Sequence, residues 1–296
     1  MATNNLENNI EGVEQEASHE VTIYAEPIFH VGNFQITNSL ITSWVSVLVL
    51  VLFFLAIRFN LKKVPGKLQN FFEVMLEGAL SLCDQVTNDR KISEKILPVV
   101  FTVFIFILVN NWIGLIPLVG SMGFYALEEG HNVFVPLLRA GTADINTTLS
   151  LALMAVIGSN IFGVIIIGGW KMFNKYVNIQ ALFDIFKKVK KDKSVLILSP
   201  ISVFVGLLEL VGEMAKIASL SFRLFGNVFA GEVLLASMAA IFVYVLPGPF
   251  LFLEVFVGLI QALIFSLLTA VYFTIASQDH SEHEHGEHDE KDLAHV

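Results

Sequence analysis

Charged residues are scarce in this sequence. Only 15% of its 296 residues are charged, whereas 55% are hydrophobic and the mean hydropathy is +0.70. A soluble domain carries about 25% charged residues, so this shortage excludes an ordinary soluble protein and predicts an integral membrane protein. The net charge of −9 comes from acidic residues near both ends, while lysine and arginine lie beside apolar segments. That distribution indicates membrane orientation and argues against binding of nucleic acid.

Cysteine is also scarce, and histidine is missing from the apolar segments. Disulfides need cysteine, and metal sites and many catalytic sites use cysteine or histidine. The single cysteine, Cys83, excludes an internal disulfide framework and offers no metal cluster, so we expect it to be a small packing residue. An intramembrane hydrolase would need a nucleophile–base pair or metal ligands in the apolar segments, yet no histidine occurs between His131 and His280. We therefore predict no catalytic residue, no metal site and no cofactor.

The N-terminal residues lack the basic segment and following apolar core of a signal peptide. We interpret residues 1–38 as an extramembrane tail, residues 39–277 as the membrane domain and residues 278–296 as a tail rich in acid and histidine. The histidines of this last tail could bind a transition metal, although its composition favours a solvated acidic tail. Without a transit peptide, a bacterial membrane is the simplest location.

Apolar segments and their flanking charges predict the topology. Residues 40–57 carry no charge and approach the ~20 residues that a helix needs to cross the hydrocarbon core. No lysine or arginine precedes Arg58, so the positive-inside rule places the N-terminus outside. Residues 96–118 and 145–170 are two further spans, joined by an external loop poor in basic residues. The connector at 171–193 contains seven lysines and is therefore expected in the cytoplasm.

Two stretches do not have the pattern of a simple span. In residues 67–86 apolar residues recur at spacings of three and four, which predicts an amphipathic helix that lies on the membrane surface or packs on a partner protein. Residues 195–246 would form a helix of roughly 75 Å, which means either two spans or one strongly tilted helix. Residues 247–249, Pro-Gly-Pro, are expected to break the chain before a last helix over residues 250–276.

Ionisable residues occur within these last two apolar segments, where each is costly. They are Glu209, Glu213, Lys216, Arg223, Glu232 and Glu254. One interpretation is a set of structural salt bridges, such as Glu209 or Glu213 with Lys216. A second interpretation is an ion path in two offset halves, with Arg223 between them. The cost of charge within a membrane favours this second interpretation.

Polar and small residues surround these charges. A projection at 100° per residue groups them by helix face: Glu209, Lys216, Arg223 and Asn227 share one face, and Glu254, Gly258 and Gln261 share another. Gly226 and Ala230 form a small-xxx-small pair, which suits close packing or a smooth surface for a sliding partner. In the earlier spans, interhelical hydrogen bonds are expected from Asn110, Asn111, Ser159 and Asn160.

The segment from Ser221 to Glu232, SFRLFGNVFAGE, resembles the signature of subunit a of the F-type ATP synthases, the stator of a rotary, ion-driven machine. The similarity continues in VPGK at 64–67, NWIGLIP at 111–117, ADINTTLS at 143–150 and QALIFSLLTAVY at 261–272. Several motifs in the same order over residues 40–277 make this resemblance specific. A stand-alone secondary transporter would instead predict an internal repeat, and none is evident.

The resemblance implies an all-α fold: one span, a surface helix, a transmembrane hairpin and a hairpin of two long tilted helices. It implies a ring of c subunits, the peripheral-stalk b subunits and membrane lipids as partners. In a bacterial inner membrane, five crossings from an external N-terminus would leave the C-terminus in the cytoplasm. The implied site has Arg223 facing the carboxylate of the c-ring, Asn227 and Gln261 near it, Glu232 and Glu254 in an external half-channel and Glu209 in a cytoplasmic one.

Overall fold

The computed structural model describes residues 25–32, 34–116, 119–120, 122–128, 131–169, 195–241 and 247–278. Three sets of predictions lie outside these described residues: those for residues 1–24, for the basic connector at 171–193 and for the histidine-rich tail from residue 279.

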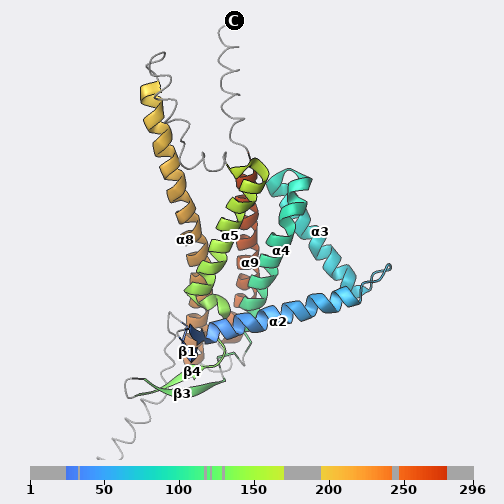
Figure 1. Ribbon diagram of the computed structural model, residues 1–296. Coiled ribbons are helices and arrows are strands. Elements are labelled where there is room, and N and C mark those ends of the chain that lie inside the picture. Colours follow the sequence, from blue (N-terminus) through green and yellow to red (C-terminus); the bar gives the residue numbers. More distant parts are fainter. Residues whose placement is uncertain are drawn as a thin grey trace, which may run out of the picture. The chain divides into compact units, whose positions relative to one another are not determined.

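The described elements are helices and two short hairpins of strands (Figure 1). The helices are α2 (Asn38–Phe59), α3 (Lys67–Thr87), α4 (Arg90–Gly114), α5 (Ile145–Ile167), α8 (Val195–Ile241) and α9 (Pro247–Ser277), with a short 3-10 helix η1 (Gly141–Ala143). Among the described residues, five helices are long and apolar enough to cross a membrane: α2, α4, α5, α9 and residues 204–241 of α8. The predicted all-α integral membrane protein is confirmed.

Helix α8 decides whether the long apolar segment from residue 195 forms two spans or one helix. It runs as one helix of 47 residues, which is about 70 Å at a rise of 1.5 Å per residue. A hydrocarbon core is only ~30 Å thick, so such a helix must tilt strongly or extend beyond the core. One long helix, rather than two spans, is therefore correct.

The start of α4 differs from its prediction. The helix begins at Arg90 and not at residue 96, because the Asp89 carboxylate accepts a hydrogen bond of 2.9 Å from the Lys91 N–H. This bond caps the first turn of the helix. An ion pair between Arg90 and Glu94, four residues apart, also spans this turn. The absence of charge identified the span but not the polar turn that precedes it.

Two other helix ends also correct the prediction. Helix α5 ends at Ile167 rather than at residue 170, because Gly168 takes a φ of 100°, a left-handed helix end that suits glycine. Helix α9 begins at Pro247, so the Pro-Gly-Pro sequence forms its first turn instead of a break before it. Proline is tolerated there because the first N–H groups of a helix need no partner within the helix.

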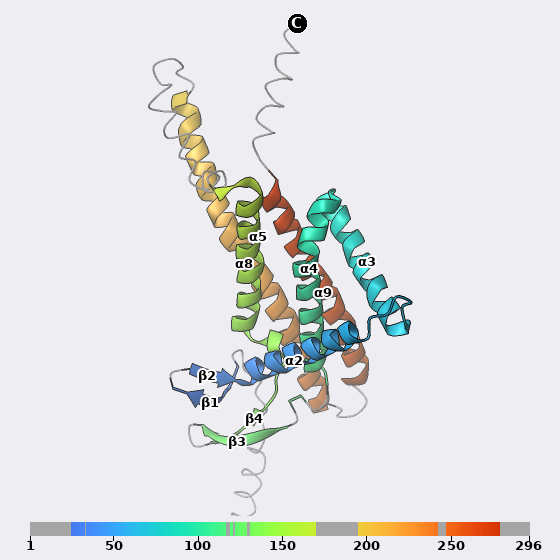
Figure 2. The ribbon, with the colours of Figure 1, turned by 45° about the vertical axis from the view of Figure 1, so that its right-hand side comes forward.

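Two β-hairpins were not predicted. Strands β1 (Pro27–Val31) and β2 (Phe34–Thr37) pair antiparallel within the expected N-terminal tail, and β3 (Gly123–Glu128) pairs with β4 (His131–Pro136) in the expected external loop. Figures 1 and 2 show the first hairpin directly before α2. Strands this short carry little sequence pattern, and an isolated two-stranded hairpin is only marginally stable.

Contacts within the chain divide it into two compact units, which we describe separately. The first unit contains residues 1–76, 101–150 and 221–266, and the second contains residues 77–100, 151–220 and 267–296.

In the first unit, the N-terminal part of α2 is held by polar contacts. Its buried residues are Asn38, Ser39, Thr42, Ser43 and Ser46, whereas its apolar side chains are largely exposed, as lipid contact would require. Ser39 donates to the Asp144 carboxylate at 3.0 Å, and Ser46 donates to the Asn110 side-chain oxygen at 3.1 Å. The predicted interhelical role of Asn110 is confirmed.

In the second unit, one charged cluster joins α5, α8 and α9. The Lys216 ammonium lies 2.6 Å from one carboxylate oxygen of Glu213, and the Asn160 amide donates to the other at 3.2 Å. The same ammonium lies 5.3 Å from the ring centre of Tyr272, a cation–π contact. The structural interpretation is thus correct for the pair of Glu213 and Lys216, and Asn160 forms the predicted interhelical bond.

Cys83 provides a test of the second unit. Its side chain is 1% exposed, as expected for a packing residue, and burial raises the pKa of its thiol. Less thiolate is then present at a given pH, and the thiolate is the reactive form. We expect maleimide at pH 7.5 to label the folded protein very slowly and the denatured protein within minutes, measured by mass spectrometry. Rapid labelling of the folded protein would contradict this packing.

Candidate functional site

A small cavity lies among the elements of the first unit. It has a volume of about 40 Å³ and is lined by Asn111, Gly114, Leu115, Ala140, Val228, Glu232, Leu235, Glu254 and Gly258. These residues come from α4 and the turn that follows it, the loop before η1, α8 and α9. A water molecule needs about 10–15 Å³ of such volume, so the cavity has room for roughly three. Two carboxylates, from two helices apolar enough to cross a membrane, therefore share a cavity with room for a few water molecules.

Glu232 enters this cavity from α8 with an arginine bound to it. The Arg139 guanidinium donates from Nε at 3.2 Å and from Nη2 at 3.0 Å to the same carboxylate oxygen, Oε2. The Arg139 side chain is only 9% exposed and that of Glu232 is 25% exposed. Charge-assisted hydrogen bonds in such surroundings are among the stronger ones in proteins. Glu232 is thus one half of a largely buried ion pair.

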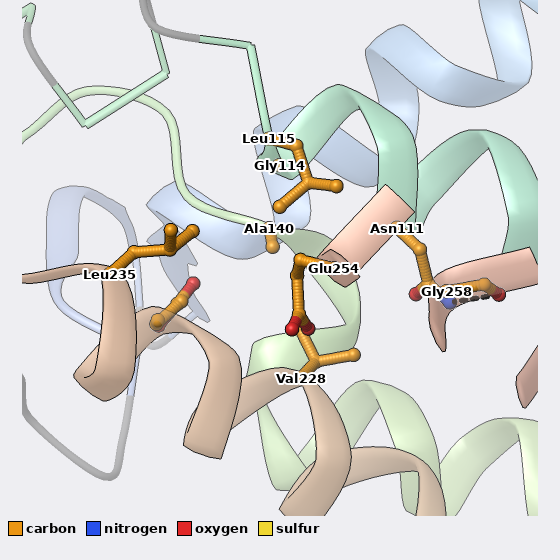
Figure 3. Close-up of a pocket in the computed structure, with 9 residues that line it drawn as sticks. Asn111, Gly114, Leu115, Ala140, Val228, Leu235, Glu254 and Gly258 are labelled. Carbon is orange, nitrogen blue, oxygen red and sulfur yellow. Dashed lines mark hydrogen bonds between the residues drawn. The ribbon is translucent and has the colours of Figure 1, made fainter. Parts of the chain in front are cut away.

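Glu254 reaches the cavity from α9. Figure 3 shows its carboxylate in the cavity, close to Val228 and below Ala140. The carboxylate lies directly against the backbone of Gly231 on α8, so that any Cβ added at Gly231 would overlap it. Gly231 therefore makes room for Glu254. The cavity brings Glu232 and Glu254 together.

Asn111 fixes the helices around the cavity. Its amide nitrogen donates to the Gly258 carbonyl at 3.2 Å, drawn as a dashed line in Figure 3, and its oxygen accepts from the Thr142 hydroxyl at 2.8 Å. The neighbouring Trp112 donates from its ring nitrogen to the Val255 carbonyl at 3.1 Å. These bonds join α4 to η1 and α9 and confirm the predicted interhelical role of Asn111.

Arg223 lies on a different part of the first unit. It is exposed on α8, and it is not among the residues that line the cavity. Gly226 and Ala230 are exposed nearby on the same helix, and a methyl group added at Gly226 would meet no heavy atom within 4 Å. This side of α8 is therefore smooth and uncovered in the described part of the chain.

Two amide side chains of the first unit, one on α8 and one on α9, have unused donors. The Asn227 Nδ2 and Gln261 Nε2 atoms are buried and have no hydrogen-bond partner among the described residues. A buried amide donor without a partner costs free energy, so water or a partner group would stabilise both. Neither residue lines the cavity of Glu232 and Glu254.

Glu209 belongs to the second unit, where it is half-buried on α8. The five other predicted site residues belong to the first unit. Sequence reasoning missed Arg139 as a site residue. Its one available signal was a lone arginine in an expected external loop otherwise poor in basic residues.

Comparison with known proteins gives consistent matches. The family model described as ATP synthase A chain matches residues 40–274. The chain is 32% identical to the ATP synthase subunit a of Gloeobacter violaceus over 83% of this chain and 86% of the relative. It is 33% identical to the subunit a of Mycobacterium tuberculosis over 80% and 84%, respectively. It is 30% identical to the sodium ion specific ATP synthase subunit a of Propionigenium modestum over 87% and 80%.

Two glycines on α8 form a matched pair for testing the site. Gly231→Ala places a methyl group on the Glu254 carboxylate, and such overpacking costs typically 1–3 kcal/mol. Gly226→Ala meets no neighbouring atom and should leave stability unchanged or raise it by up to about 1 kcal/mol. Thermal unfolding of both variants in detergent measures the difference. Equal melting temperatures would contradict the close contact between Gly231 and Glu254.

Proposed function

The chain belongs to the family of ATP synthase A chains, subunits of the ion-translocating membrane sector, and we propose that it is the non-catalytic stator of that sector. It forms two offset half-channels for protons against a rotating ring of c subunits. Glu232 and Glu254 line the external half-channel, and Glu209 lines the cytoplasmic one. Arg223 separates the two, with Asn227 and Gln261 beside it.

The proposed mechanism follows from the cost of charge in lipid. A proton enters through one half-channel and neutralises a carboxylate of the c-ring, which can then rotate through the hydrocarbon region without a charge. After nearly a full turn the carboxylate meets the other half-channel and releases its proton. Each proton that crosses 100 mV supplies roughly 2.3 kcal/mol, so several steps must be combined mechanically for one ATP.

Arg223 has two tasks in this scheme. Opposite charges attract, so its guanidinium favours the ionised carboxylate of the partner as that group passes. It also repels cations, which prevents protons from moving directly between the half-channels. An arginine suits both tasks because its guanidinium stays protonated where a buried lysine can lose its charge.

The observation that carries the proposal is the exposed side of α8. Arg223, Gly226 and Ala230 are all exposed within a helix that is apolar enough to span a membrane. Lipid is a poor neighbour for a guanidinium, whereas small residues allow another helix to approach closely. A second subunit with an acidic side chain fits both properties. The unused amide donors of Asn227 and Gln261 also fit a neighbouring water chain or partner carboxylate.

The proposal includes an orientation and three regions. Residues 1–38 lie outside the cell membrane, residues 39–277 form the membrane domain, and residues 278–296 form a cytoplasmic tail. The membrane is a bacterial inner membrane, in which the peripheral-stalk b subunits and lipids contact the remaining surface. The exposed apolar side of α2 supports lipid contact.

Replacement of Arg223 tests the function directly. We expect Arg223→Ala to abolish ATP-driven proton pumping while the subunit still assembles, because the barrier between the half-channels and the attraction for the c-ring carboxylate are both lost. Pumping is measured by dye quenching in inverted membrane vesicles, and assembly by immunoblot. Arg58→Ala, which removes an arginine from the last turn of α2, is the matched control. Normal pumping by Arg223→Ala would refute the proposed role.

The identity of the transported ion is tested separately. We propose protons, so ATP hydrolysis should remain coupled to pumping in buffers from which Na⁺ has been removed. The relative in Propionigenium modestum is named as sodium ion specific, which makes Na⁺ the competing ion. Hydrolysis that stops without Na⁺ and resumes when Na⁺ is restored would replace protons by Na⁺ in the proposal.

A further inference from the structure

We propose that Arg139 is a positioning residue that sets the net charge of the cavity shared by Glu232 and Glu254. The inference deepens the proposed function, because it rests on that cavity being part of the external ion path. It concerns a loop residue that lies outside the apolar helices and outside the set of residues expected from the sequence.

The geometry of the pair supports a fixed orientation. Two hydrogen bonds from the Arg139 guanidinium end on Oε2 of Glu232, so the guanidinium holds this carboxylate by one oxygen. The arginine is more deeply buried than its partner, at 9% against 25% exposure. Glu232 lines the cavity, whereas Arg139 is not among its lining residues.

The loop that carries Arg139 is itself held in place. The backbone N–H of Arg139 donates to the Thr42 hydroxyl on α2 at 3.2 Å, and that hydroxyl in turn donates to the Asn38 carbonyl at 3.1 Å. The Asn38 amide donates to the Pro136 carbonyl at 3.2 Å, just before Arg139 in the chain. The backbone of the loop that carries Arg139 is therefore bound to α2 at two points.

Charge arithmetic explains what the pair does for the cavity. Glu232 and Glu254 alone would place two negative charges around a space of about 40 Å³, where like charges disfavour each other's ionisation. With Arg139 included, the three ionised groups carry a net charge of minus one. Such a cavity attracts a single cation without binding it as strongly as two free carboxylates would. Glu254 is then the group that meets the entering ion.

The first experiment measures the charge of the cavity without any use of pumping. Leu235, which lines the cavity, is replaced by cysteine, and the rate of its reaction with Ag⁺ is followed in membranes containing the full chain. Cys83 contributes little background because it is buried. Unreacted thiol is quantified with maleimide after denaturation.

A more negative cavity concentrates cations and should speed this reaction. In the Leu235→Cys background we expect Arg139→Gln to raise the Ag⁺ rate severalfold and Glu232→Gln to lower it. The double variant Arg139→Gln/Glu232→Gln restores the net charge and should return the rate close to the starting value. Arg58→Gln, which removes the same charge at a site 16 residues along α2 from Thr42 (about 24 Å by helical rise), should have no effect. Equal rates in all variants would overturn the proposal.

The second experiment separates a charge effect from simple support of the loop. Arg139→Gln should reduce ATP-driven pumping per amount of assembled protein by about tenfold, and Arg139→Lys should retain most of it because the charge remains. The double neutral variant should pump better than either single variant. A double variant as defective as Arg139→Gln would show that the arginine only supports the loop, and the proposal would fail.

Poor accumulation of Arg139→Gln also has a defined meaning. Recovery of normal protein levels in the double variant would support charge compensation. The second substitution, Glu232→Gln, removes the carboxylate that lost its arginine, but it does not repair the loop. No recovery in the double variant would overturn the proposal. If Arg223→Ala pumps normally while the Ag⁺ rates change as expected, the proposed function fails and the role of Arg139 in the cavity remains.

Discussion

Polar groups within a membrane must be paired or hydrated, because lipid offers them no hydrogen bonds. This requirement organises the described parts of the chain. In the first unit, the buried hydroxyl and amide groups of α2 bind the loop that leads to η1, and Asn111 joins α4 to η1 and α9. In the second unit, Glu213 is satisfied on both oxygens by Lys216 and Asn160. Helices that are apolar on average are thus joined at defined points by their few polar residues.

The same requirement distinguishes two arginines in the first unit. Arg139 is buried and pairs with Glu232 of the same chain, whereas Arg223 is exposed on a spanning helix. The first arrangement is an ion pair between two side chains of the chain itself. The second places a guanidinium at the surface of α8, beside small residues that allow a second subunit to approach. This exposed side is the basis of the proposal that a partner subunit contacts α8.

Much of the fold could be predicted from hydropathy alone. Uninterrupted apolar segments gave the spans, and spacings of three and four gave α3. The predictions were wrong where a single local bond decides the outcome: the Asp89 cap extends α4 backwards, and Gly168 ends α5 early. The two hairpins were missed because strands of four to six residues have too little pattern to separate them from loops.

The sequence by itself determined the class of the protein, its five spans and the family, because the cost of burying charge in lipid leaves few places for Arg223, Glu232 and Glu254. It also identified these residues as candidates for an ion path. Only the tertiary structure decided which charges meet. Arg139 and Glu232 are 93 positions apart in the chain, and no periodicity links a loop residue to a helix so distant in sequence. Their pairing depends on the contacts of α2 with the loop, which are properties of packing rather than of composition.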